Sequence, residues 1–400
     1  MPHSRKASNS SLTNCGNLAA PPASTFLLHS GWFAIIVYPA GLGARVWIAP
    51  AKLGAKMPYY GIAQPRAIGD HGMSAGPLVV TYPMTAHRRA IVAEELAGAG
   101  EAIYLTDLPP EARAGALREA GAVLANDISR ELRPGESSLI GNARLLQFSA
   151  AGVDWVPTRD LPPALPVAGN KGASAEPMAE HIAALALAAA KRLFIEHDEL
   201  KRGTFNQGSP NRMLRGAVCG ILGFGAVGVA TARLMRAFGM KIHAVNRRGA
   251  SEEPNDWIGT TERLDDLLRA SDVLVISAAL TTATEGLIGA RELALMKQDA
   301  ILVNVARGEI VDEAALYAHL TAHPRFCAGI DAWWVEPVRH GRFTMGYPFL
   351  NLPNVIGSPH NSAGGGVWRD VSLRRAVANC RRALLGETPL NLIGPDERML

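Results

Sequence analysis

The sequence has little cysteine for its length. Its 400 residues include only Cys15, Cys219, Cys327 and Cys380, which are far apart and show no C-x-x-C spacing. This pattern argues against a zinc site or a disulfide framework, and no metal is expected. The four residues are typical of small hydrophobic side chains in a reducing compartment, so we expect a cytoplasmic protein.

The sequence also lacks a strong charge imbalance. Forty Lys and Arg residues against 36 Asp and Glu give a net charge of +4, and no run of five like charges occurs. A nucleic-acid-binding protein is expected to concentrate basic residues, so nucleic acid is not an expected partner. A hydrophobic fraction of 48% with 19% charged residues excludes a mainly disordered chain and predicts about two domains.

A long uninterrupted apolar run is missing as well. Residues 26–43 are apolar but are broken by a histidine, a glycine and a proline. A signal peptide or membrane anchor is conceivable there, but the interruptions favour neither, and no membrane partner is expected. We expect residues 1–76 to be a poorly ordered or non-native extension, with Met57 or Met73 as alternative beginnings.

Glycine, by contrast, is placed with a clear pattern. An apolar run at residues 217–222 is followed by Gly223, Gly225 and Gly228, then by a helical pattern and a second strand-like run at 241–246. This G-x-G-x-x-G arrangement gives a tight turn, a close approach of backbone to pyrophosphate, and close packing of helix on strand. The segment therefore predicts a dinucleotide-binding unit.

The end of the second strand indicates which dinucleotide is bound. An NAD site usually carries Asp or Glu there, whereas this chain has Asn246, Arg247 and Arg248. Two guanidinium groups attract a 2′-phosphate, so we predict a preference for NADP(H), with NAD(H) possible. The alternative is that the two arginines are solvated loop charges.

Short apolar runs alternate with helical patterns along the rest of the chain. Strands are expected at 78–82, 102–106, 122–126, 144–149, 272–277, 300–306 and 325–331. Helical patterns run through Ile91 and Leu96 and over 111–120, 262–269, 290–296, 313–321 and 368–385. A further helical pattern at 175–202 could conceal two helices and offer a dimer face. This alternation predicts an α/β protein with two doubly wound lobes on parallel sheets, one Rossmann-like and the other of the same general, flavodoxin-like type.

The domain division follows from this order. Residues 77–175 and 363–400 are expected to form a substrate-binding domain, and residues 176–362 an inserted cofactor domain. Ala151 and Gly152, in the loop FSAAGVD, place backbone amides at the carboxyl edge of the first sheet, where they could hold a substrate carboxylate. The alternative is an ordinary tight loop.

Three titratable or charged residues follow predicted strands of the cofactor domain. They are Arg307 in NVARG, Glu336 in IDAWWVEP and His360 in GSPHNSAGGG. Reduction of a 2-oxo acid needs a cation for the carboxylate, a proton donor for the carbonyl oxygen, and an acceptor that orients the donor. These three residues supply those groups at the edge where a nicotinamide is expected.

At this point the chain resembles the D-isomer-specific 2-hydroxyacid dehydrogenase family from about residue 78 to the C-terminus. The motifs are GFGAVG, LVNVARGEIVDEAAL, AGIDAWWVEP and NVIGSPHNSAG. The resemblance implies that Arg307 binds the substrate carboxylate, that His360 is the acid/base, and that Glu336 is its partner. It also implies homodimers joined through the cofactor domains. The further residues that it assigns to ligands are Ala226, Val227, Leu280, Thr281, Val305, Ala306 and Asp331 for the cofactor, and Ala151 and Gly152 for the substrate.

The expected reaction is NAD(P)H-dependent reduction of glyoxylate, hydroxypyruvate or a larger 2-oxo acid to the D-2-hydroxy acid. One alternative is a nucleotide-sensing binding protein of the corepressor type on the same fold. Another is a dehydrogenase of the formate or phosphite type. Between Glu336 and His360, the side chains of Arg339, His340 and Arg342 could reach the mouth of the cleft or face solvent, and the solvent-facing arrangement is favoured.

Overall fold

The computed structural model describes residues 28–30, 33–38, 45–50, 76–158 and 160–394. The chain divides into two compact units, Met1–Gly72 and Met73–Leu400. The described part of the first unit is an antiparallel sheet of β1 (Leu28–Ser30), β2 (Phe33–Tyr38) and β3 (Arg45–Pro50). The sequence analysis did not predict these strands. Most of the 1–76 extension, including Met57 and Met73, lies outside the described residues, so its character stays a prediction.

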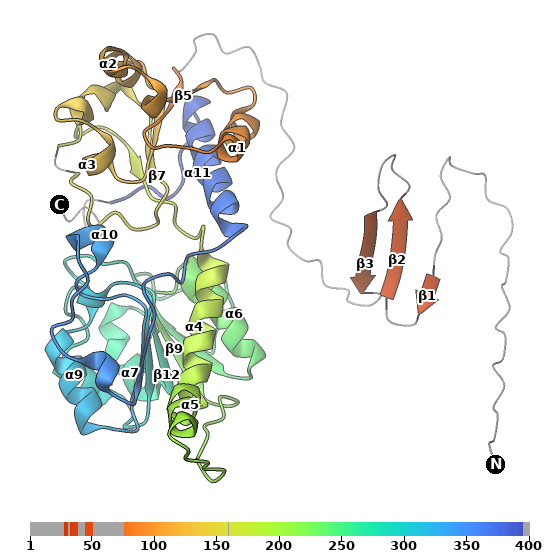
Figure 1. Cartoon of the computed structure of the whole chain (residues 1–400), viewed down its shortest axis with the longest axis vertical. Helices are drawn as coiled ribbons and strands as arrows, with labels where there is room; N and C mark the ends of the chain where they lie inside the picture. The colour runs from red at the N-terminus through yellow and green to blue at the C-terminus, as the bar shows by residue number, and fades with distance from the viewer. Residues whose placement is uncertain (1–27, 31–32, 39–44, 51–75, 159, 395–400) are drawn as a thin grey trace, which may run out of the picture. The chain divides into compact units, whose positions relative to one another are not determined.

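The second unit contains two parallel sheets, each with helices against it (Figure 1). The smaller sheet has the strand order β5-β4-β6-β7-β8, which is the order of flavodoxin-like folds. Its strands are β4 (Leu78–Val80), β5 (Ala102–Tyr104), β6 (Ala122–Ala125), β7 (Leu146–Phe148) and β8 (Val167–Ala168), joined by α1 (Ala86–Leu96), α2 (Pro110–Arg118) and α3 (Ile128–Glu131). The central strands β4, β6 and β7 are buried throughout, as parallel strands covered on both faces must be.

The last helix of the chain belongs to this smaller lobe. Helix α11 (Trp368–Leu384) packs against α1, β6 and β7. The side chain of Asn379 on α11 donates a buried hydrogen bond of 2.6 Å to Oε1 of Gln147 on β7. The chain thus leaves the smaller lobe after β8 and returns to it at α11, which confirms the two-lobe α/β architecture.

The larger sheet has seven parallel strands in the order β11-β10-β9-β12-β13-β14-β15. Apart from the added strand β15, this is the order of dinucleotide-binding folds, in which the chain reverses direction beside the first strand. The strands are β9 (Val218–Leu222), β10 (Lys241–Val245), β11 (Trp257–Gly259), β12 (Val273–Ile276), β13 (Ile301–Asn304), β14 (Cys327–Ile330) and β15 (Val355–Gly357). The reversal places the carboxyl ends of β9 and β12 next to the glycine turn.

The helical pattern at 175–202 forms two helices, α4 (Ala175–Ala190) and α5 (Leu193–Lys201), and only α4 packs on β13, β14 and α6. Arg192 between them has a φ of 52°, a left-handed conformation that cannot continue a helix. The other helices of this lobe are α6 (Ala226–Ala237), α7 (Leu264–Ala270), α8 (Ala290–Leu295), α9 (Glu313–Ala322) and α10 (Pro337–His340). Short 3₁₀ helices are η1 (Leu105–Asp107), η2 (Glu136–Asn142), η3 (Thr261–Arg263), η4 (Gly308–Ile310) and η5 (Phe349–Asn351).

The short strands β8, β11 and β15 and the short helices α3 and α10 were not expected, because two to four residues carry too little periodic signal.

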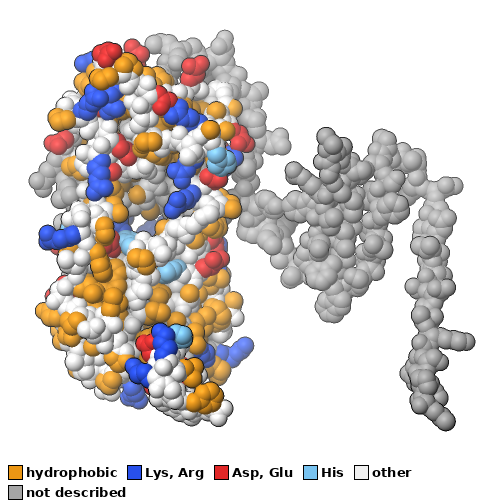
Figure 2. Space-filling model, viewed as in Figure 1, with side chains coloured by type: hydrophobic (Ala, Val, Ile, Leu, Met, Phe, Trp, Pro, Cys, Tyr) orange, Lys and Arg blue, Asp and Glu red, His pale blue; other side chains and the backbone are white. Residues whose placement is uncertain are grey.

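Surface and interior agree with the composition. Cys219, Cys327 and Cys380 are free and buried, as expected for small hydrophobic residues. Acidic and basic side chains are interspersed over the described surface shown in Figure 2. Within residues 76–158 and 160–394 no helix has the length and hydrophobicity needed to cross a membrane, and no group of three His, Cys, Asp or Glu side chains is arranged to hold a metal.

Candidate active site

The three glycines of the G-x-G-x-x-G turn occupy three different environments. Gly223 has a φ of +96°, and a Cβ there would collide with the backbone of Ala278. A Cβ on Gly228 would lie 2.5 Å from the carbonyl oxygen of Gly223, where helix α6 packs on β9. A Cβ on Gly225, by contrast, would meet no protein atom within 4 Å. The first and third glycines therefore serve the fold, and the second leaves open space.

That open space lies at the start of α6. Gly225 is the N-cap of this twelve-residue helix, and no side chain caps it. The first amides of the helix, including those of Ala226 and Val227, are therefore available to an anion at the positive end of the helix dipole. The residues present fit the pyrophosphate of a dinucleotide.

The turn after β10 is organised by Asn246. Its side-chain Oδ1 accepts from the backbone N–H of Arg248 at 3.0 Å, and its Nδ2 donates to the carbonyl of Ala250 at 3.0 Å. Asn246 thus holds the turn that presents Arg247 and Arg248, whose side chains are both exposed. The turn lies at the end of the strand next to β9, where the ribose of a bound dinucleotide is expected.

The remaining cofactor candidates lie in loops at the same edge. Leu280 and Thr281 follow β12; Leu280 is buried in the core, and the Thr281 amide donates to Oγ1 of Thr284 at 2.8 Å. Val305 and Ala306 follow β13, with Val305 buried. The sequence analysis placed these residues at the cofactor, and the structure places them at the carboxyl edge of the sheet. Their contacts to a dinucleotide stay a prediction.

His360 and Glu336 form a direct pair. The Nδ1 atom of His360 lies 2.8 Å from both carboxylate oxygens of Glu336. The imidazole therefore has its Nε2 atom left for a substrate. Glu336 is buried, whereas the side chain of His360 is 28% exposed, so the pair is open on the imidazole side only.

The charge state of Glu336 follows from its neighbours. Burial raises the pKa of its carboxyl, but the hydrogen bond and charge of His360, the backbone N–H of Trp333 and the charge of Arg307 outweigh burial. The net effect lowers the pKa below that of an ordinary glutamate, and the carboxylate stays ionised at neutral pH. The charge of Arg307 makes the smallest of these contributions.

Asp331 holds the loop that carries His360. Its fully buried carboxylate accepts from the amides of Asn361 at 3.2 Å and Ser362 at 3.3 Å, and from the Ser358 hydroxyl at 2.5 Å. This anchoring matters because His360 has a φ of 48°, a conformation that non-glycine residues rarely adopt. Asp331 therefore acts in this structure as a clamp on the His360 loop, while its expected contact with the nicotinamide stays a prediction.

Arg307 is fixed by a residue of the other lobe. Its Nε and Nη2 atoms donate to the carboxylate of Asp154 at distances of 3.0 to 3.2 Å, and its Nη1 donates to the carbonyl of Ala306 at 2.8 Å. A guanidinium has five N–H groups. One N–H on each of Nη1 and Nη2 therefore remains, which is the edge needed for a bidentate contact with a substrate carboxylate.

A second arginine joins this ion pair, contrary to expectation. Arg339 was expected to face solvent, but its side chain is only 15% exposed and lies 3.6 Å from Asp154 and 2.5 Å from Glu309. That expectation was wrong because Arg339 lies on α10, which meets the smaller lobe: Arg130 of α3 donates to the carbonyl of Val338. His340 and Arg342 are exposed, as expected.

The loop with Ala151 and Gly152 lies against Arg307. A Cβ on Gly152 would come within 2.5 Å of Nη2 of Arg307, so only glycine allows this approach without a shift. Ala151 is exposed. The structure thus brings the predicted carboxylate loop and the predicted carboxylate arginine together from the two lobes.

Asp154, Ser358 and His181 were not predicted as members of this site, and Arg339 was considered there only as the less favoured alternative. His181 on α4 lies 2.8 Å from the Ser358 hydroxyl and so extends the Asp331 clamp. Asp154 stood in the quoted loop FSAAGVD, and its charge next to small residues was the available signal. No such signal marked His181, which lies in an Ala- and Leu-rich helix.

Comparison with known proteins agrees with this geometry. Residues 183–362 match the model of the D-isomer specific 2-hydroxyacid dehydrogenase NAD binding domain. The chain is 36% identical over 226 residues to a glyoxylate/hydroxypyruvate reductase B of Pectobacterium carotovorum subsp. carotovorum (strain PC1), covering 55% of this chain and 69% of that protein. It is 36% identical over 242 residues to a glyoxylate reductase of Aeropyrum pernix, covering 58% and 70%.

A solved structure shows the same architecture. The D-isomer specific 2-hydroxyacid dehydrogenase of Xanthobacter autotrophicus Py2, in complex with NADPH and MES, superimposes with a TM-score of 0.66 at 26% identity, covering 80% of this chain and 98% of that one. The relatives, the fold and the match to the nucleotide-binding domain all indicate the same family. The chain belongs to the D-isomer specific 2-hydroxyacid dehydrogenase family.

Proposed function

We propose that this protein reduces a 2-oxo acid to the corresponding D-2-hydroxy acid with a nicotinamide dinucleotide as reductant. The observation that carries this proposal is the His360–Glu336 pair, open at Nε2, beside an arginine with a free bidentate edge. Glyoxylate and hydroxypyruvate are the first candidate substrates, because relatives at 35–36% identity are named as reductases of these acids.

Each residue has a distinct task in this reaction. When bound, the reduced dinucleotide supplies the hydride that the carbonyl carbon accepts. Arg307 binds the substrate carboxylate through its Nη1 and Nη2 edge and so fixes the carbonyl relative to the imidazole. His360 delivers a proton from Nε2 to the carbonyl oxygen, and Glu336 positions the imidazole through Nδ1 and stabilises its charged form.

The dinucleotide would be held by the open position at Gly225, the first amides of α6 and the turn after β10. We propose a preference for NADPH, because Arg247 and Arg248 stand where a carboxylate would select NADH. The NADPH in the Xanthobacter structure is a property of that protein and supports the idea by likeness. An Arg247→Ser/Arg248→Ser variant is expected to lose affinity for NADPH about 10- to 100-fold and to keep its affinity for NADH.

A spectrophotometric screen of 2-oxo acids with both reduced cofactors tests the whole proposal. It also separates the rival functions. A corepressor-like binding protein would bind the dinucleotide without turning over any 2-oxo acid. An enzyme of the formate or phosphite type would reduce the oxidised cofactor with formate or phosphite and ignore the 2-oxo acids.

We also propose a homodimer formed through the cofactor domain. Helix α5 and the segment after it expose large apolar side chains: Leu193 is 57% exposed, Leu200 53%, Phe205 75% and Met213 69%. Such a group of apolar residues is typical of a contact surface. Light scattering at several concentrations tests it, and a monomer at micromolar concentration would contradict it.

A further inference from the structure

A cavity of about 180 Å³ lies in the smaller lobe, at the carboxyl ends of β4, β6 and β7. Tyr82 follows β4, Asn126 follows β6 and Ser149 follows β7, and all three line the cavity. The carboxyl ends of adjacent parallel strands are where open α/β sheets bind ligands. We call this cavity the distal pocket.

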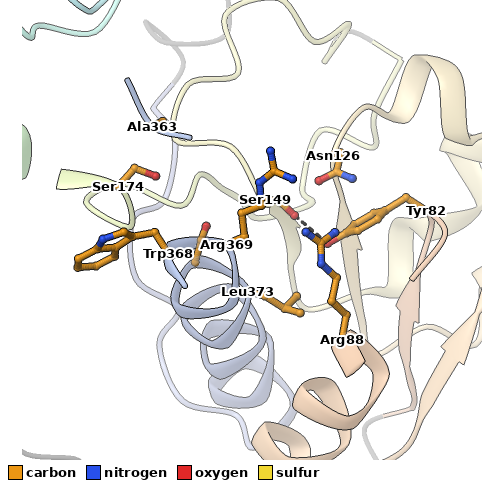
Figure 3. Close-up of a pocket in the computed structure, with 10 residues that line it drawn as sticks. Tyr82, Arg88, Asn126, Ser149, Ser174, Ala363, Trp368, Arg369 and Leu373 are labelled. Carbon is orange, nitrogen blue, oxygen red and sulfur yellow. Dashed lines mark hydrogen bonds between the residues drawn. The ribbon is translucent and has the colours of Figure 1, made fainter. Parts of the chain in front are cut away.

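Two arginines, the half-buried Arg88 and the exposed Arg369, line the distal pocket from two neighbouring helices. Figure 3 shows Arg88 from α1 and Arg369 from α11 extending toward the hydrogen-bonded pair of Tyr82 and Ser149, whose oxygens are 3.0 Å apart. Within the described residues, neither guanidinium forms a hydrogen bond or an ion pair. The pocket thus contains two positive charges whose hydrogen-bonding groups are not engaged by the protein.

The described acidic residues near Arg88 and Arg369 form their own contacts with other groups and do not pair with these two arginines. Arg89, next to Arg88, pairs with Asp107. Asp370, next to Arg369, lies 2.7 Å from His87. Glu131, whose charge acts on Tyr82, accepts hydrogen bonds from the Thr81 hydroxyl and from the amides of Asn126 and Asp127. The local acids are therefore committed to other groups.

The hydroxyl groups of the pocket suit an anion as well. Burial, with a smaller contribution from the charge of Glu131, raises the pKa of the Tyr82 phenol to about 12, against the Ser149 hydrogen bond and the charge of Arg88, which lower it. The phenol is thus neutral and keeps its proton at neutral pH. On the other side, Trp368 and Leu373 give the pocket an apolar wall that suits linking carbon atoms.

The distal pocket adjoins the proposed reaction site. Ser149 lies two residues before Ala151 of the carboxylate loop, so their Cα atoms are at most about 7 Å apart. Ala363, which also lines the pocket, lies three residues after His360, at most about 11 Å along the chain. Two residues that line the pocket therefore lie in the loops that carry the proposed carboxylate-binding and acid/base residues.

We propose that the distal pocket binds a second anionic group, a carboxylate or a phosphate, at the far end of the 2-oxo acid substrate. The inference rests on the proposed 2-oxo acid reduction, and it makes the preferred substrate a tail-charged acid rather than glyoxylate. Arg88 and Arg369 determine this specificity, and Tyr82 and Ser149 complete the hydrogen bonding.

The test compares pairs of substrates that differ only in the tail. Reduction by the full-length protein is measured with NADPH and with NADH. One pair is 2-oxoglutarate and 2-oxopentanoate, and the other is 3-phosphohydroxypyruvate and hydroxypyruvate. We expect kcat/KM to favour the charged member of at least one pair by roughly 10- to 100-fold, as for loss of charge-assisted hydrogen bonds. The first pair reports on a carboxylate, and the second on a phosphate.

Variants locate the effect. In Arg88→Gln/Arg369→Gln the preference should fall by the same factor, mainly through KM, while glyoxylate turnover, which involves no tail, changes less than about threefold. Arg375→Gln, an exposed position further along α11, is the matched control and should keep the preference. Equal kcat/KM within both pairs, or a preference that survives the double variant, would overturn the inference and leave the reductase activity intact.

Absence of turnover with every 2-oxo acid would count against the proposed function instead. In that case calorimetric titration with 2-oxoglutarate and 3-phosphohydroxypyruvate tests anion binding in the distal pocket independently of turnover. Binding to the wild type that is lost in Arg88→Gln/Arg369→Gln supports the distal pocket, and no binding to the wild type overturns it.

Discussion

The two sides of the candidate site are built in different ways. On the cofactor-domain side, His360 is hydrogen-bonded to Glu336, 24 positions away, and the amides of Asn361 and Ser362 donate to Asp331, 30 and 31 positions away. On the substrate-domain side, Asp154 reaches Arg307 across 153 positions. The acid/base group is thus assembled within one lobe, whereas the carboxylate-binding group depends on contact between the lobes. Substitutions on the two sides should therefore change different kinetic constants.

The largest effect is expected for His360→Asn. Asparagine is chosen because it tolerates the left-handed backbone of this position better than alanine does. Loss of the proton donor should lower kcat about 10²- to 10⁴-fold, with cofactor affinity unchanged. Steady-state kinetics and fluorescence titration with NADPH measure the two quantities. A kcat within threefold of the wild type would remove His360 from the chemistry.

On the other side, Asp154→Asn should have a smaller effect of another kind. Without the carboxylate, Arg307 loses the partner that holds its Nη1 and Nη2 edge toward the substrate, so KM should rise about tenfold and kcat should change little. The melting temperature should also fall, because the arginines on either side lose their shared anion. Glu309→Gln, which affects Arg339 alone, is the control. A lower KM would mean that Asp154 competes with the substrate instead of positioning the arginine.

This difference also explains what could be predicted from the sequence. The glycine turn and Arg307 follow strands β9 and β13, which local patterns predicted. The role of His360 was predicted from the family motif around it, because the strand before it, β15, was not expected. The contacts of Asp154 and Arg339 depend on how two lobes meet, which no local period encodes. The distal pocket could not be predicted for the same reason, since Arg88 and Arg369 come from helices that are almost 300 residues apart in the sequence.

A smaller contrast is expected within the glycine turn itself. Gly228→Ala should lower the free energy of unfolding by about 1 to 3 kcal/mol, because its Cβ would press on the Gly223 carbonyl. Gly225→Ala meets no protein atom and should leave unfolding unchanged while weakening NADPH binding. Urea denaturation and cofactor titration of both variants test this. Equal stability losses would mean that the second position is structural too.

The smallest effect concerns the pH dependence of stability on the cofactor-domain side. The pKa of Glu336 is lowered in the folded state, against about 4.3 in an unfolded chain. Its ionised form therefore stabilises the protein fully above that value, and this contribution is lost as the pH falls through the lower folded-state pKa. The urea midpoint of the wild type should exceed that of Glu336→Gln at pH about 7, and the gap should narrow as the pH falls below about 4. A gap that stays constant would show that Glu336 contributes by packing, and the positioning of His360 would then not depend on its charge.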